Sequence, residues 1–139
     1  MEHVEQTRRL THRGVMAMLS AGIAKAEEKR QPQCIVILDA SGEVLGEIRM
    51  TGSKFLSRRS ALAKALTAAS HGMASELIPE TVRPAIAAAT DGGVTGLPGG
   101  LPIRVDGVLV GGIGVGSGAP DQDVAVARAA LAAISADDV

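Results

Sequence analysis

Residues 101–115, LPIRVDGVLVGGIGV, carry the clearest local signal in this sequence of 139 residues. Asp106-Gly107 separates two runs rich in branched aliphatic residues, and this pattern predicts a β-hairpin with a two-residue turn. The second run and its end contain the glycines Gly111, Gly112, Gly114 and Gly116. Glycines inside a strand allow close approach, here of a helix, a neighbouring subunit or a flat ligand.

A second hairpin, three helices and a further segment that is a short helix or a loop are predicted around the first hairpin. Runs of β-forming residues at 34–40 and 43–50 flank a Ser-Gly turn signal. Helical spacing and start signals predict helices that begin at or near Thr11, Ser53 and Pro120. Residues 84–90 form either a short helix with Pro84 in its first turn or a loop. The chain is therefore predicted to be one domain, 1–139, of the α/β (α+β) class, in which helices pack a mostly antiparallel sheet. A polar leader, 1–9, and a frayed tail, 135–139, are expected at its ends.

Composition argues against several classes of partner. The net charge is −1, from 14 basic and 15 acidic residues, so no overall field favours nucleic acid or a membrane. Phe55 is the single aromatic residue, which removes the usual stacking platforms for bases. No apolar run approaches the roughly 20 residues that span a bilayer, and the N-terminus lacks a signal-peptide pattern. We expect a cytoplasmic protein that binds neither nucleic acid nor membrane, with its single Cys34 packed as a small apolar residue.

The scarcity of large side chains also bears on assembly. A core of Ala, Val, Leu, Ile and Gly buries little area per side chain, and burial stabilises by only ~25 cal/mol per Å². Association of subunits would add buried area, so the composition favours a homo-oligomer.

The glycine-rich end of the last predicted strand is also similar to a phosphate-binding loop. Gly114, Gly116 and Ala119 fit a variant of the dinucleotide fingerprint. The preceding strand, however, comes from a hairpin rather than a crossover, and Asp121 and Asp123 at the helix start would repel a phosphate. A steric role for the glycines is therefore the better interpretation.

Taken together, these motifs resemble the GlcG/HbpS-like family, which includes the C-terminal domain of PduO-type proteins. Residues 99–131, GGLPIRVDGVLVGGIGVGSGAPDQDVAVARAAL, are similar to the family signature. Upstream, IVILDASGEVLGEIRM (35–50) matches its first hairpin, and RRSALAKALTAAS (58–70) matches its central helix. The sequence departs from the family at 116–118, where Gly-Ser-Gly stands in place of the usual Ser-Gly-Gly.

The resemblance implies a profilin-like fold that is commonly oligomeric. Some members bind haem, and others accompany glycolate, diol or cobalamin metabolism without a settled activity. A small-molecule ligand, with haem or another tetrapyrrole as the first candidate, is therefore implied, and a catalytic mechanism is not.

Two histidines are candidates for the functional site. His71 lies on the predicted central helix, at a position that is apolar in many relatives, and a neutral imidazole there would serve as an axial haem ligand or a general base. His12 lies in the first turn of the first helix, where at least some haem-binding relatives use a histidine. The structural alternatives are a helix-end histidine that contacts a carbonyl and a solvated first-turn residue.

Cations and glycines complete the set of candidates. Lys64 is predicted either to act beside His71 or to form an ion pair with Asp39. Arg49 and Arg58 suit a carboxylate or haem propionates. The ligand-binding candidates on the glycine-rich loop are Pro98, Gly99 and Gly100. No cluster has the spacing of a zinc site, so no resident metal is predicted.

Two functions are favoured at this point, and a purely structural or accessory oligomer stays open as a third. The first is a small-molecule-binding protein of the haem-binding type, with His71 or His12 toward the iron. The second is a cofactor-free isomerase, hydratase or lyase, in which His71 moves a proton and Lys64 with an arginine holds a carboxylate. The sequence does not decide whether the protein is an enzyme.

Overall fold

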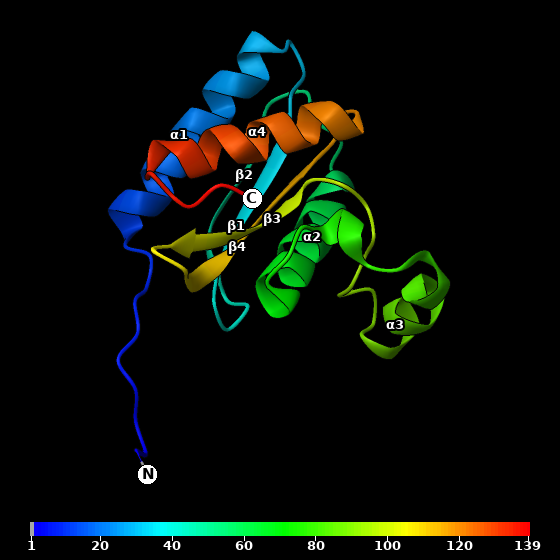
Figure 1. The fold of residues 1–139 in the computed structure, drawn as a ribbon. Coiled ribbons are helices and arrows are strands. Elements are labelled where there is room, and N and C mark those ends of the chain that lie inside the picture. Colours follow the sequence, from blue (N-terminus) through cyan, green and yellow to red (C-terminus); the bar gives the residue numbers. More distant parts are fainter. Residues whose placement is uncertain (1) are drawn as a thin grey trace.

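A computed structural model describes residues 2–139 and shows one antiparallel sheet between two helical layers (Figure 1). The strands are β1 (Cys34–Asp39), β2 (Val44–Arg49), β3 (Gly100–Val105) and β4 (Val108–Gly116). The α-helices are α1 (His12–Glu28), α2 (Ser57–His71), α3 (Arg83–Ala89) and α4 (Pro120–Ala133). Two 3₁₀ turns, Ser75–Leu77 and Glu80–Val82, join α2 to α3.

Both predicted hairpins are present, and together they form the sheet. The strand order is β2-β1-β4-β3, and every neighbouring pair is antiparallel. The Asp106-Gly107 turn joins β3 to β4, and both residues have positive φ angles, as a type I′ hairpin turn requires. The α+β fold expected from the sequence is confirmed.

Alternate residues of the central strands face the two helical layers. Ile35 and Ile37 on β1 belong to the core shared with α1 and α4, which pack side by side over one face of the sheet (Figure 1). Val36 and Leu38 point to the opposite face and pack with α2. This alternation follows from the two-residue period of a strand and explains why β1 is apolar along most of its length.

The glycines of β4 bring the strand against the backbone of α2. A Cβ atom at Gly114 would collide with the Ala61 carbonyl oxygen, and one at Gly112 would lie 2.6 Å from the Ala65 carbonyl oxygen. Ala61 and Ala65 are themselves fully buried. The steric interpretation of the glycine-rich strand is therefore confirmed, and the closely approaching element is the central helix.

Two local details differ from what the sequence suggested. The central helix begins at Ser57 instead of near Ser53, whose hydroxyl donates a hydrogen bond to the Met50 carbonyl at 2.7 Å. In the tail that was expected to fray, the Asp137 amide donates to the Arg104 carbonyl at 2.8 Å. The Asp137 carboxylate also accepts hydrogen bonds from two turn amides, Asp106 and Gly107. The carboxylate of Asp137 thus accepts the hydrogen bonds of two amides in the hairpin turn. The polar composition of the tail did not predict this contact.

Over residues 2–139, no helix combines the length and the apolar character that a membrane-spanning segment needs.

Candidate functional site

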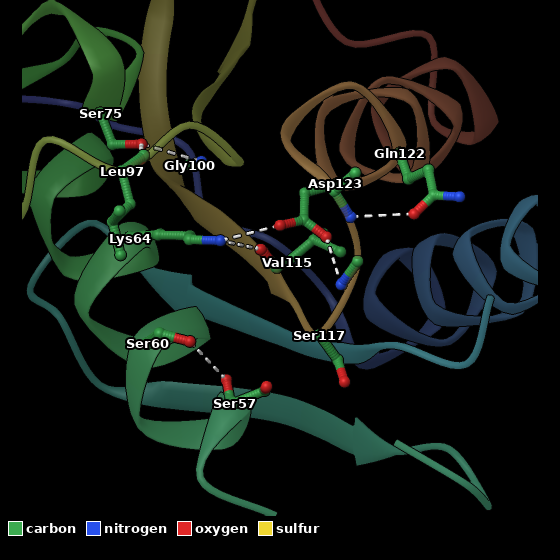
Figure 2. A network of polar contacts seen from close by, with 12 residues as sticks. Ser57, Ser60, Lys64, Ser75, Leu97, Gly100, Val115, Ser117, Gln122 and Asp123 are labelled. Carbon is green, nitrogen blue, oxygen red and sulfur yellow. Dashed lines mark hydrogen bonds and ion pairs between the residues drawn. The ribbon is translucent and has the colours of Figure 1, made fainter. Parts of the chain in front are cut away.

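A buried ion pair joins the central helix to the start of α4 (Figure 2). The Lys64 Nζ atom lies 3.0 Å from Asp123 Oδ2 and donates a hydrogen bond to the Val115 carbonyl at 2.7 Å. Lys64 is 5% exposed and Asp123 is 3% exposed. The ammonium group is therefore held inside the protein, with one charged and one neutral acceptor.

The partner of Lys64 differs from the one that the sequence suggested. Asp39 does not pair with Lys64. Its Oδ1 atom accepts hydrogen bonds from the Ser41 amide at 2.8 Å and the Glu43 amide at 3.0 Å. Asp39 thus closes the first hairpin turn, as aspartate often does when its carboxylate bonds the backbone two residues ahead.

Burial sets the protonation behaviour of Asp123. Removal from water raises the pKa of the carboxyl group, while Lys64 and the Gly118 amide, at 3.0 Å, act to lower it. The desolvation effect is the largest, so the pKa lies above its ordinary value of 3.8.

This raised pKa predicts an unusual dependence of stability on pH. Asp123 binds its proton more tightly in the folded chain than in the unfolded chain, so its contribution to stability is fully present below pH 3.8 and is lost as the pH rises through the folded pKa. We expect the free energy of unfolding of the wild type, minus that of Asp123→Asn, to fall as pH rises through this window. Denaturant unfolding of both proteins at a series of pH values measures the difference, and an increase with pH would contradict the prediction.

The candidate glycines of the loop pack around the ion pair. Gly99 has a φ angle of +117°, and a Cβ atom there would lie 3.2 Å from Lys64 Nζ. The Gly100 amide donates to the Ser75 hydroxyl at 3.0 Å, and that hydroxyl donates to the Leu97 carbonyl (Figure 2). These two glycines allow the loop to cross closely over α2. Pro98 instead lines a surface cleft of about 420 Å³ beside the start of α4.

His71 lies at the C-terminal end of α2, next to Gly72 in the left-handed conformation. Its Nδ1 atom is 3.2 Å from the Thr67 carbonyl oxygen, one turn back on the same helix. Lys64 is seven residues away, a rise of about 10 Å along the helix axis. His71 and the ammonium group of Lys64 therefore do not form a compact acid–base pair, and the ammonium group is already bonded inside the protein.

The two candidate arginines are in different surroundings. Arg58 forms a two-bonded ion pair with Glu47, with Nε 2.7 Å from Oε1 and an Nη atom 3.2 Å from Oε2, and this contact raises the pKa of the arginine. Arg49 lines a cleft of about 590 Å³ between α1 and β2, together with Arg30 and apolar residues that include Ile23. Arg49 is thus the candidate arginine that borders a cleft of ligand size.

His12 borders a smaller cleft at the start of α1. This cleft, which we call the His12 cleft, has a volume of about 310 Å³ and is lined by Arg9, Leu10, Thr11, His12, Asp39 and Leu45. The Thr11 hydroxyl caps α1 by accepting a hydrogen bond from the Gly14 amide at 3.1 Å, which fixes His12 as the first helical residue. The lining residues of the cleft include a histidine, an arginine, an aspartate and two leucines.

The structure therefore does not gather the predicted residues into one site. His12, Arg49 and Pro98 border three separate clefts, and Lys64 is enclosed with Gly99 and Gly100. Sequence reasoning missed Arg9 and Leu45 as neighbours of His12. Arg9 and His12 are three residues apart at the start of the first helix, so the sequence could have predicted that they lie close together. The position of Leu45, on β2, depends on how the strand packs against this helix. Residues 2–139 contain no group of three His, Cys, Asp or Glu side chains arranged to hold a metal ion.

Comparisons with known proteins agree with this fold. The family model described as "Haem degrading protein HbpS-like" matches residues 10–132. The corrinoid adenosyltransferase PduO of Salmonella typhimurium is 31% identical over 120 residues, which is 83% of this chain and 36% of the relative. The chain thus spans about a third of the length of the curated relatives it matches.

Two solved structures are similar over nearly their whole length. The PduOC:haem complex superposes with a TM-score of 0.87 at 27% identity, covering 94% of this chain and 98% of that one. The ORFY protein of Klebsiella pneumoniae gives a TM-score of 0.92 at 26% identity, with 99% of each chain covered. Together with the match over residues 10–132, these likenesses show that the chain belongs to the HbpS-like family.

Proposed function

We propose that this protein binds haem, or a closely related tetrapyrrole, at the His12 cleft. The observation that carries the proposal is a cleft whose lining includes a histidine together with an arginine and two leucines. Membership of the HbpS-like family and the likeness to a structure described as a PduOC:haem complex support this choice of ligand.

The donor set of the cleft fits a tetrapyrrole with carboxylate substituents. A neutral His12 would supply the nitrogen ligand, since imidazole is a common axial ligand of haem iron. Arg9 would hold a propionate through charge-assisted hydrogen bonds, and Leu10 with Leu45 would contact the apolar ring. Bound haem would supply an iron centre for ligand or redox chemistry.

The size of the cleft implies that the ligand is only partly enclosed. Its volume of about 310 Å³ is at the lower end of the ~300–1,000 Å³ typical of ligand pockets. A tetrapyrrole held there would extend beyond the cleft. Phe55 is not among the lining residues, so apolar contact would come from the leucines.

His12 is favoured over His71 by its surroundings. His71 borders none of the three clefts described above. The alternative of a carboxylate-processing enzyme is less well supported, because Lys64 is buried and bonded to Asp123. A cytoplasmic location stays a prediction from the sequence.

A haem titration tests the proposal. We expect added haemin to give a shifted Soret band that saturates with the wild type, and His12→Ala to weaken binding by at least about tenfold, as loss of metal-site groups does. His71→Ala is the matched control and should bind as the wild type does. Absorption spectra with each variant measure the effect, and circular dichroism confirms that each variant is folded.

Two results would overturn the proposal. One is a wild-type protein that gives no Soret shift. The other is a Soret shift that persists in His12→Ala. This result would overturn the proposal whether or not His71→Ala loses the shift.

A further inference from the structure

The two edges of the sheet are protected to very different degrees. On β3, the Gly100 amide donates to the Ser75 hydroxyl at 3.0 Å, and the Arg104 carbonyl accepts from the Asp137 amide at 2.8 Å. Between them, Pro102 has no amide hydrogen to offer. Two outward groups of this edge are thus bonded within the chain and one amide hydrogen is absent, as is usual where natural sheets avoid edge-to-edge pairing.

The β2 edge lacks comparable protection. The Met50 amide donates to the Gln33 carbonyl at 3.0 Å, so the backbone groups of Met50 face β1. Because the direction of these groups alternates along an antiparallel strand, those of Ile48 also face β1. The backbone groups of Glu47 and Arg49 therefore face away from β1. Within residues 2–139, the elements with extensive contacts to β2 are β1 and α1, and five of the six residues of β2 are exposed. The strand sequence, VLGEIR, contains no proline or lysine to block pairing.

Apolar side chains are exposed along the same strand. The exposed fractions of Val44, Leu45 and Ile48 are 44%, 41% and 37%. An open strand edge with exposed aliphatic residues favours the addition of another strand, because both backbone groups and apolar area would then be satisfied.

We propose that β2 pairs antiparallel with β2 of a second copy of this chain, with the two-fold axis at Ile48. In this register, Glu47 lies opposite Arg49 of the partner subunit, and the two-fold axis repeats that pair of opposite charges. Centres on Glu47 or Arg49 would place like charges opposite each other, and a centre on Gly46 would leave Glu47 opposite an apolar leucine. Charge complementarity therefore selects both the occupant and the register.

The ion pair that Glu47 forms within its own chain supports the register centred on Ile48. Glu47 lies beside Arg58 on the α2 side of the sheet, so in the pair each carboxylate has a cation from its own chain and one from the other. Ile48 projects to the α1 side, where the two isoleucines meet at the axis. The result is a continuous sheet through two subunits, and the small-residue core gains buried area at the β2 edge.

The mass of the ligand-free protein in solution tests the pairing. We expect sedimentation equilibrium to give twice the chain mass, or an even multiple, for the wild type at micromolar concentrations. Ile48→Lys places two ammonium groups at the axis and should halve that mass, whereas Leu77→Lys, at a residue that is also exposed but lies outside the sheet, should leave it unchanged. A wild type with the mass of one chain, or an assembly that survives Ile48→Lys, would overturn the proposal.

Cysteine cross-linking and a charge swap test the register. Ile48→Cys should form a disulfide between subunits under mild oxidation, because facing residues of a non-hydrogen-bonded pair have Cα atoms about 4.5 Å apart. Leu77→Cys is the matched control, and the native Cys34 is buried. Glu47→Arg and Arg49→Glu should each reduce the mass, and the double variant should restore it. Failure of both the cross-link and the rescue would overturn the register. None of these measurements involves haem, so they stand apart from the test of the proposed function.

Discussion

Lys64→Met is expected to lower the free energy of unfolding by about 3–5 kcal/mol, as breaking a buried ion pair typically does. The substitution keeps most of the side-chain volume but leaves the Asp123 carboxylate in the interior without its cation, 3.0 Å from where the ammonium group was. Chemical denaturation followed by circular dichroism measures the change.

The same substitution at the surface provides the control. Lys25 forms an ion pair with Glu28 one turn ahead, at 3.2 Å, and Lys25→Met should change stability by less than about 0.5 kcal/mol. The double variant Lys64→Met/Asp123→Leu should regain most of the loss, because it removes both buried charges together. A double variant as unstable as the sum of the single variants would show that packing, not charge, is decisive.

Gly114→Ala should also be strongly destabilising, by about 3 kcal/mol, as overpacking of a tight core can be. The added methyl group would collide with the Ala61 carbonyl oxygen and lie 2.6 Å from the Ala65 amide nitrogen. Both are backbone atoms of a buried helix, so the strain can be relieved only by moving α2 away from the sheet. Thermal or denaturant unfolding of the variant gives the measurement.

Gly14→Ala serves as the matched control in the same protein. Gly14 is inside α1, and the nearest atoms to its added methyl group would be Thr11 Oγ1 at 3.7 Å and Ile134 Cγ2 at 3.9 Å, which are ordinary contacts. Alanine is the better helix former, so we expect a gain of up to about 1 kcal/mol. Equal effects at the two positions would contradict the interpretation of β4 as a strand that needs glycine for close approach.

Much of the fold was predictable because its signals are local. The Asp106-Gly107 turn, the short helix after Pro84 and the helix that begins at Pro120 each depend on residues a few positions apart. The steric role of Gly114 was also visible, since a glycine weakens the interior of a strand and often marks a site where another backbone approaches closely.

The pairing of charges was not predictable in the same way. Lys64 and Asp123 are 59 residues apart, and Asp123 in the sequence is indistinguishable from a residue that favours a helix start. Asp39 was the carboxylate that the sequence suggested as the partner of Lys64. Its position at the end of a strand, two residues before Ser41, instead suits a turn in which its carboxylate bonds the backbone. The pairing depends on how α2 crosses β4, which only the packing determines.

The candidate site was predictable only in part, for a related reason. The sequence named His12 as a candidate, but its cleft also needs Leu45 from β2 and Asp39 at the end of β1. The sequence also named His71, at a position that is apolar in many relatives, yet this residue borders none of the three clefts described above. Which histidine borders a cavity is a property of the assembled layers.

Locating bound iron by NMR tests the central claim most directly. Paramagnetic haem broadens nearby amide signals, with zinc protoporphyrin as the diamagnetic reference. We predict that broadening in the ¹⁵N spectrum centres on residues 9–13 and Leu45, which surround the His12 cleft. Broadening centred on residues 66–72, around His71, or no selective broadening at all, would contradict it.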